Sequence, residues 1–174
     1  REEVDLVGLL VDTVADARAA GPEHDWQLDL AVLEPPAGAT AEEAEDFLPE
    51  PPLVIGDEAR LRQVVVNLLA NARVHTPAGS HVTTTLAREG DTLIVRIHDD
   101  GPGIAPDVRD RLFERFARGD SSRERRTGST GLGMSIALAI VQSHGGSIDV
   151  DSSTASEDHG TTFTVRLPAA VVEE

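Results

Sequence analysis

The chain has 174 residues, a formal net charge of −16 and no cysteine. This length suits a single domain with its own core, and the lack of cysteine excludes disulfides and thiolate metal sites. The negative charge argues against a nucleic-acid partner, because phosphate backbones require basic surfaces. No apolar run approaches the roughly 20 residues of a membrane-spanning helix.

The few positive charges are concentrated in one stretch. All 15 basic residues are arginines, and seven of them lie between positions 107 and 126 beside five acids, which gives this window a net charge of +2 and the remainder −18. A positive island in an acidic domain is a suitable landing site for a small polyanion. The plain alternative is a solvated arginine-rich loop without a ligand.

The first third of the chain predicts a helix, a strand and an insertion. Apolar periodicity predicts a helix from Val4 to Ala20, which Gly21 ends. Alternation from Trp26 to Leu33 predicts a half-buried strand. Residues 35–52 are rich in proline, alanine and acid, which predicts a long flexible surface insertion that has room for a local helix at Ala41–Phe47.

The stretch from Asp57 to Pro77 predicts one amphipathic helix, because its apolar residues recur at helical spacing. Asp57 can cap its start and Pro77 prevents its continuation. Asn67 and Asn71 lie about 40° apart on one flank of the apolar stripe. Buried amides need polar partners. These partners are either backbone groups of a neighbouring strand or a cation with phosphate.

The remaining elements complete a mixed fold. The pattern predicts a short strand before the central helix, a hairpin after it, a helix after residue 133 and two closing strands. Their ranges are Leu53–Ile55, His81–Ala87, Thr92–His98, Met134–His144, Ser147–Asp151 and Thr161–Leu167. Strict βαβ alternation is absent, which favours an α+β fold: a two-layer α/β sandwich with helices packed on one face of a mixed, mostly antiparallel sheet.

Two glycine motifs carry chemistry. Residues 99–104, Asp-Asp-Gly-Pro-Gly-Ile, directly follow a predicted strand. A carboxylate there can accept a hydrogen bond from an exocyclic amine such as that of adenine, or the motif is an ordinary acidic turn. Residues 131–133, Gly-Leu-Gly, open a helix after the basic stretch, where free helix N–H groups can bind phosphate, or the glycines serve only close packing. The Gly-Lys-Ser/Thr ending of a P-loop is absent.

These motifs occur in one order: the asparagine helix, residues 99–104, the segment Leu112–Phe116, residues 131–133, and Gly160–Phe163. In this combination the chain resembles the catalytic, ATP-binding domain of bacterial sensor histidine kinases, within the superfamily of gyrase, heat-shock-chaperone, histidine-kinase and mismatch-repair ATPases. The resemblance extends from about Val4 to Pro168 and covers the chain as a single domain. It implies a Bergerat-type fold in which residues 105–130 form a mobile lid over ATP.

The resemblance also implies ATP and Mg²⁺ as cofactors and assigns roles to residues. Asn71 would bind Mg²⁺ through its amide oxygen, Asp99 would accept the adenine amine, and Arg118 would reach the γ-phosphate. Asn67 and Arg118 are the implied catalytic residues. The implied ATP-binding residues are Asn67, Asn71, His75, Asp99, Gly101, Gly103, Ile104, Phe116, Arg118, Thr130, Gly131, Leu132, Gly133, Met134 and Thr162.

The chain departs from the family pattern at two positions. Val74 stands where a Lys or Arg commonly follows the second asparagine, and Ser129 stands where many relatives have a glycine. Arg73 lies roughly 200° around the helix from Asn71, so it is a poor substitute, whereas His75 lies about 40° away. The lid arginines are therefore expected to carry more of the phosphate binding.

The expected function is transfer of the γ-phosphate to a histidine on a separate domain. His24 precedes an acid as a phosphoacceptor does, but it lacks the following basic residue and proline and enters a strand. Asn67 occupies the place where related ATP hydrolases have a glutamate base, which disfavours a self-contained ATPase. An anti-sigma-type serine kinase and a non-enzymatic nucleotide-binding module remain alternatives.

The resemblance implies partners outside this stretch. The chain begins at Arg1 without a methionine, so we expect a fragment of a longer protein. That protein is expected to carry the phosphoacceptor-histidine domain, which is absent here, with a membrane span further upstream in a bacterial cell membrane. It is expected to form a homodimer and to act on a response regulator. The fragment itself is expected to be cytoplasmic and monomeric.

Overall fold

The computed structural model describes residues 1–113 and 133–171. A five-stranded sheet has the order β2-β4-β5-β7-β6, and a separate two-stranded sheet pairs β1 with β3. The strands are β1 (Glu2–Asp5), β2 (Asp25–Asp29), β3 (Leu53–Gly56), β4 (His81–Glu89), β5 (Thr92–Asp99), β6 (Ser147–Ser153) and β7 (Gly160–Pro168). The helices are α1 (Leu6–Ala20), η1 (Ala31–Leu33), α2 (Ala41–Glu45), α3 (Glu58–His75), α4 (Pro106–Arg109) and α6 (Gly133–Ser143).

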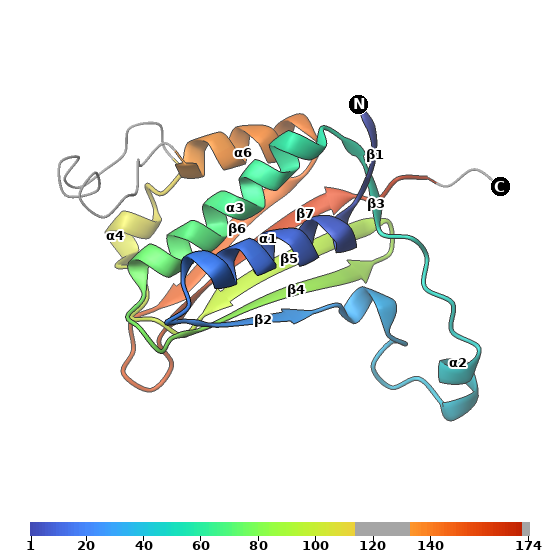
Figure 1. The fold of residues 1–174 in the computed structure, drawn as a ribbon, viewed down its shortest axis with the longest axis horizontal. Helices are drawn as coiled ribbons and strands as arrows, with labels where there is room; N and C mark the ends of the chain where they lie inside the picture. The colour runs from blue at the N-terminus through green and yellow to red at the C-terminus, as the bar shows by residue number, and fades with distance from the viewer. Residues whose placement is uncertain (114–132, 172–174) are drawn as a thin grey trace.

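The architecture is the predicted α+β sandwich. In the large sheet β2 pairs with β4 in parallel, whereas β4–β5, β5–β7 and β6–β7 are antiparallel. Figure 1 shows α1, α3 and α6 lying side by side over one face of this sheet. The mixed, mostly antiparallel sheet with helices on one face is confirmed.

Helix α3 is the central element of the helical layer. The Asp57 carboxylate caps its start by accepting a hydrogen bond from the Arg60 N–H at 3.2 Å. Its apolar stripe is buried as predicted: Leu61, Val64, Val65, Leu68, Leu69 and Ala72. Arg62 reaches Asp12 of α1 at 3.5 Å, and the side of α3 away from α1 packs against α6. Its orientation about its own axis is therefore fixed from both sides.

Two predicted elements were wrong because other structure takes up part of their range, whereas the bounds of the remaining elements differ from the prediction by at most two residues. The chain forms β1 before the first helix, and Val4 pairs with Val54 of β3, both buried, so the helix starts at Leu6 rather than Val4. Strand β1 has four residues and only one buried side chain, so its sequence shows no alternation of apolar and polar residues from which a strand could be predicted. Strand β2 ends at Asp29 because its ladder with β4 ends there, and the residues that follow form η1.

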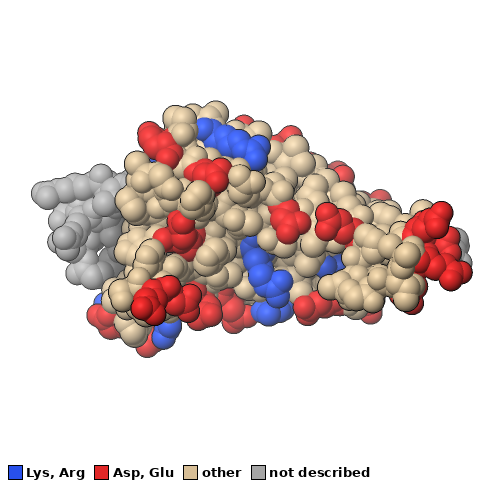
Figure 2. Space-filling model, turned by 90° about the horizontal axis from the view of Figure 1, so that it is seen from below, with Lys and Arg blue, Asp and Glu red and all other residues tan. Residues whose placement is uncertain are grey.

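The segment 35–52 leaves the body of the domain, as an insertion should (Figure 1). It contains the short helix α2, whose Thr40 and Glu43 form a capping box. The acids of α2 are exposed, and Figure 2 shows acidic side chains spread over the face seen from below, with a dense group at one end. The flexibility of this segment stays a prediction.

None of the helices in the described ranges is long and apolar enough to span a bilayer.

We predict that Leu68→Ala lowers the free energy of unfolding by about 2–5 kcal/mol, because it leaves a cavity under a fully buried side chain of α3. Urea unfolding measures this difference. Leu48→Ala is the matched control, since Leu48 is 88% exposed and its loss removes no core contact. Equal effects of the two substitutions would contradict the packing described here.

Candidate functional site

Helix α3 meets the start of α6 through Asn67. Its side-chain Nδ2 donates to the Gly133 carbonyl oxygen at 3.3 Å. A Cβ added at Gly133 would still lie 3.8 Å from that Nδ2, so the first residue of α6 faces the amide closely without clash. One of the two asparagines thus finds a backbone partner, on a helix rather than on a strand.

Asn71 lies one turn further along the same flank of α3 and is half-buried. Within the part of the chain that the structure describes, its side chain has no hydrogen-bond partner. Further along, Thr76 at the end of α3 packs against Gly101. Asn71 therefore offers an unengaged amide between the start of α6 and the loop that follows β5.

Asp99 is the last residue of β5 and is only 6% exposed. Its Oδ1 accepts a hydrogen bond from the Gly101 N–H at 3.0 Å. Burial raises the pKa of the Asp99 carboxyl, and the hydrogen bond from Gly101 and the charge of His98 oppose this shift only in part. A carboxylate that has lost water without gaining a full set of donors is suited to accept another donor from a ligand.

The loop 99–104 is held by hydrogen bonds to three other segments, two of them through side chains and one through the backbone N–H of His81. The Asp100 carboxylate accepts from the His81 N–H at 2.7 Å, and the Ile104 N–H donates to Ser152 Oγ at 2.7 Å. His159 Nδ1 donates to the Gly101 carbonyl oxygen at 2.6 Å. These bonds fix the loop on the end of the sheet, beside Asp99.

Both glycines of this loop are required by geometry. Gly103 has φ +82°, and a Cβ there would lie 2.1 Å from the Ser153 carbonyl oxygen. A Cβ at Gly101 would lie 2.4 Å from Thr76 Cγ2. The glycines therefore allow the loop to pack closely against β6 and the end of α3.

Thr76 is a site neighbour that sequence reasoning missed. Its hydroxyl donates to the Ala72 carbonyl oxygen at 2.6 Å and accepts from His24 Nε2 at 2.7 Å. Its methyl group supports Gly101, which in turn bonds Asp99. The histidine rejected as a phosphoacceptor thus lies behind the loop 99–104.

The structure separates Thr162 from this site. The Thr162 hydroxyl lies 2.8 Å from His98 Nδ1 on the sheet face opposite the helices. Thr161 is the residue that pairs with Asp99 and is 4% exposed. Alternation could have found this, because Thr161 has the same parity as the buried Phe163 and Val165. Met134 is also buried, in the core, so only its backbone can face a ligand.

The residues after Asn71 behave as their helical angles predict. The Arg73 side chain packs on Gly21 at the end of α1, with its Cδ 2.7 Å from where a Gly21 Cβ would lie, so it points away from Asn71. Val74 is half-buried and His75 is exposed. Partial desolvation by the surrounding protein lowers the pKa of the His75 imidazole, which favours its neutral form near neutral pH.

Several predicted residues lie outside the described ranges: Phe116, Arg118, Thr130, Gly131 and Leu132. The predicted lid, 105–130, is described only as far as Phe113. That part contains α4, and the Arg109 guanidinium donates to the Ser152 carbonyl oxygen at 3.3 Å. The rest of the lid stays a prediction.

The donor set at Asn71 decides what kind of cation would fit. Among the described residues, no group of three or more His, Cys, Asp or Glu side chains could hold a metal ion. A cation at Asn71 would take one amide oxygen from the protein and its other oxygens from a ligand and water. Mg²⁺ is bound in this way by sites that also hold substrate phosphates, so the residues fit it.

Comparison with known proteins gives the context of this site. The family model of histidine kinase-, DNA gyrase B- and HSP90-like ATPases matches residues 56–171. The chain is 48% identical over 168 residues to the probable sensor histidine kinase TcrY of Mycobacterium tuberculosis, covering 97% of this chain and 31% of that protein. It is 38% identical over 172 residues to the sensor histidine kinase TrcS of the same organism, covering 96% and 30%. The chain thus spans about a third of these relatives.

Solved structures share the fold. The mycobacterial sensor histidine kinase MprB superposes with a TM-score of 0.75 at 28% identity over 97% of both chains. Full-length ShkA in complex with AMPPNP superposes with a TM-score of 0.72 at 27% identity, covering 98% of this chain and 31% of that one.

We predict that the Asp99 carboxyl titrates above the ordinary value of about 3.9, because burial disfavours its charged form. The pKa of this carboxyl is higher in the folded than in the unfolded chain. Its contribution to stability is therefore lost as the pH rises from the unfolded-state pKa to the folded-state pKa. Carboxyl-carbon NMR titration measures it. Asp25 is the control: the hydrogen bond from His81 lowers the pKa of this exposed carboxyl. Titration of Asp99 below Asp25 would contradict the assignment.

Proposed function

Because the chain belongs to the family of histidine kinase-, DNA gyrase B- and HSP90-like ATPases, we propose that it binds ATP with Mg²⁺ and donates the γ-phosphate to a histidine on a separate phosphoacceptor domain. The observation that carries the proposal is the position of Asn71, whose amide is unengaged within the described residues between the start of α6 and the loop beside Asp99.

The adenine end of the proposed site is formed by Asp99 and its loop. The carboxylate already accepts the Gly101 N–H and retains capacity for an exocyclic amine. Gly101, Gly103 and Ile104 would line the pocket, and Thr161 takes the place in this proposal that was first given to Thr162. Because Asp99 is buried, leaving its carboxylate without a further donor is costly. A base that places an exocyclic amine against this carboxylate is therefore preferred over a base without one.

The phosphate end is formed by α3 and the first turn of α6. Free N–H groups at the start of α6 and its partial positive charge favour phosphate there. Asn71 would supply its amide oxygen to Mg²⁺, which neutralises charge on the phosphates. Val74 brings no cation to this flank, so positive charge has to come from the lid, where Arg118 remains our proposed γ-phosphate contact.

An asparagine at position 67 favours phosphoryl transfer over hydrolysis of ATP. Its amide is a donor to Gly133 and has no basic group, so it cannot activate water as a general base. In our proposal Asn67 fixes the start of α6 and leaves the γ-phosphate for a nucleophile that another domain brings. This favours a kinase over a self-contained ATPase.

The partners follow from the same proposal. Because the chain spans about a third of TcrY and TrcS, the acceptor histidine would lie on a part of the protein outside this stretch. A homodimeric full-length protein in a bacterial membrane and a response regulator that receives the phosphoryl group complete the proposed pathway.

Asn71→Ala is expected to weaken Mg-ATP binding at least tenfold, or about 1.4 kcal/mol, because it removes the protein ligand of the cation. Calorimetric titration with and without Mg²⁺ measures this, and the effect should shrink without Mg²⁺. Val66→Ala is the control, since Val66 is 44% exposed on the same helix. Equal Mg-ATP affinity of wild type and Asn71→Ala would exclude Asn71 as the ligand.

With labelled ATP, the chain is expected to phosphorylate a phosphoacceptor-histidine domain supplied separately, while alone it hydrolyses ATP very slowly. Acid lability of the product distinguishes phosphohistidine from phosphoserine, the product of a serine kinase. Multi-turnover hydrolysis by the chain alone, lost in Asn67→Ala, would show a self-contained ATPase. Tight Mg-ATP binding without any transfer would show a non-enzymatic module.

A further inference from the structure

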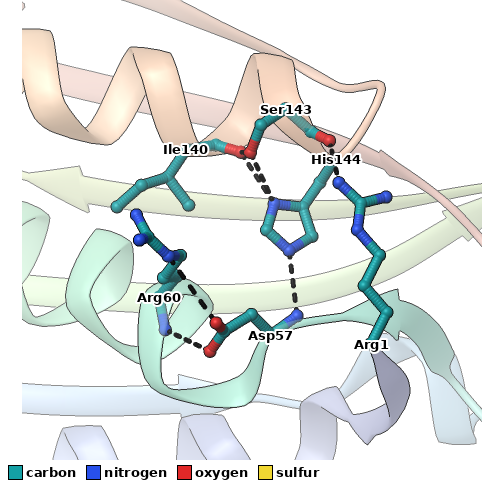
Figure 3. Close-up of polar contacts among 6 residues, drawn as sticks. All are labelled: Arg1, Asp57, Arg60, Ile140, Ser143 and His144. Atoms are coloured by element: carbon teal, nitrogen blue, oxygen red, sulfur yellow. Dashed lines mark hydrogen bonds and ion pairs between the residues drawn. The ribbon is translucent and has the colours of Figure 1, made fainter.

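The end of α6 remote from the proposed ATP site is bonded to the start of α3 through one imidazole. His144 directly follows α6 and is 7% exposed. Its Nε2 lies 3.1 Å from the Asp57 backbone nitrogen, and its Nδ1 lies 2.7 Å from the Ile140 carbonyl oxygen. Figure 3 shows the ring between the two helices, with one nitrogen directed at each.

These two partners determine the tautomer of the ring. The Asp57 N–H can only donate, so Nε2 must be the acceptor and carry no proton. The Ile140 oxygen can only accept, so Nδ1 carries the proton and donates it. Both ring nitrogens are therefore engaged, one in α6 and one at the N-cap residue of α3.

The ring is also seated sterically on the junction of β3 and α3. A Cβ at Gly56 would lie 2.3 Å from His144 Cδ2 and 2.5 Å from its Nε2, so the glycine makes room for the imidazole. The Asp57 carboxylate is turned toward Arg60, whose N–H it accepts at 3.2 Å. The ring thus contacts a part of α3 that is itself held by a cap.

The contact has a counterpart at the other end of α6. Helices α3 and α6 are antiparallel, since Asp57 faces His144 while Asn67 faces Gly133. Between these two polar contacts both helices contribute buried aliphatic side chains to the common core: Leu61, Val64, Ala137, Ile140 and Val141. Apolar burial is non-directional, so it does not select one position of α6 along its axis as sharply as hydrogen bonds do.

We propose that His144 is a positioning residue for the nucleotide site: it fixes α6 along its axis and thereby places Gly133 and the first turn of α6 against Asn67 and Asn71. This rests on the proposed function. His144 lies about 16 Å along the helix from Gly133 and does not touch the nucleotide. The Asn67–Gly133 bond lies in the proposed ligand site, whereas the His144–Asp57 bond lies outside it. We therefore expect the His144–Asp57 bond to remain when the ligand binds.

Ligands that carry different numbers of phosphates should depend on the His144 contact to different degrees. The α6 end holds phosphates, whereas Asp99 and its loop hold the base and are anchored by Ser152, His81 and His159 instead. Loss of the His144 contact should therefore weaken ATP binding at least fivefold and leave adenosine binding within twofold. ADP and AMP should fall in order between them.

The test uses two ways of removing the contact. His144→Ala removes the ring. Gly56→Ala keeps the histidine in the sequence, but the added methyl group pushes its ring away from Asp57. Gly8→Ala is the glycine control, because its Cβ would meet only Asp5 Oδ2 at an ordinary 3.6 Å. Ser143→Ala tests the neighbouring hydroxyl, which donates to the Ile140 carbonyl oxygen and lies 3.2 Å from His144 Nδ1 but does not reach α3. Affinities for ATP, ADP, AMP and adenosine are measured by NMR titration on folded protein, with melting curves alongside.

His144→Gln, whose amide oxygen can accept the Asp57 N–H, should restore ATP affinity in part. Equal losses for ATP and adenosine, or no loss in either contact variant, would overturn the proposal. Unfolding of His144→Ala, Gly56→Ala and His144→Gln alike would overturn it in favour of a purely structural role. Failure of the wild type to bind ATP would instead refute the proposed function, so the two failures are distinguishable.

Discussion

Burial of the apolar stripe of α3 is the constraint on which the rest of the structure depends. The stripe from Leu61 to Ala72 is covered by the sheet, with α1 on one side and α6 on the other, so the helix has only one rotation that removes it from water. That rotation turns the flank with Asn67 and Asn71 toward the start of α6 and sends Arg73 toward Gly21. The rotation of α3 that buries the core therefore also places the polar site. Any other rotation, which would move Asn67 and Asn71, would expose apolar side chains of the core.

The polar groups of the proposed site are those whose bonding capacity the fold does not use up. Asn67 is satisfied by Gly133, whereas Asn71 in the described structure is not satisfied, and Asp99 is buried with fewer donors than a carboxylate can accept. The cost of holding such groups appears as the raised pKa of Asp99. Around them the fold is firmly bonded, through Thr76, Ser152 and His159. A site with a rigid surround and unsatisfied centre is prepared for a ligand with an amine at one end and phosphates with a cation at the other.

The helix pair also explains how residues far from the nucleotide can matter to it. Helix α6 is bonded to α3 at both of its ends, by Gly133 to Asn67 in the middle of α3 and by His144 to Asp57 at the start of α3, and both helices contribute aliphatic side chains to the core between these bonds. One bond lies in the proposed site and the other about 16 Å away along the helix. A rigid helix transmits a displacement at one end to the other, so the imidazole at the remote end becomes part of the machinery that places the phosphates.

The sequence by itself determined the α+β layers, the central helix with both asparagines on one flank, and the family, because these depend on periodicity and on motifs of local order. It also determined that Asn67 is no base and that Val74 brings no charge, since residue type alone decides those properties. Only the tertiary structure revealed β1, whose partner is some fifty residues away, and only it paired Asp99 of β5 with Thr161 of β7. It likewise brought His24 to Thr76 and His144 to Asp57, contacts between residues separated by 52 and 87 positions. Such contacts leave no periodic trace in the sequence, because each is made by a single side chain whose partner is fixed by the packing of whole elements.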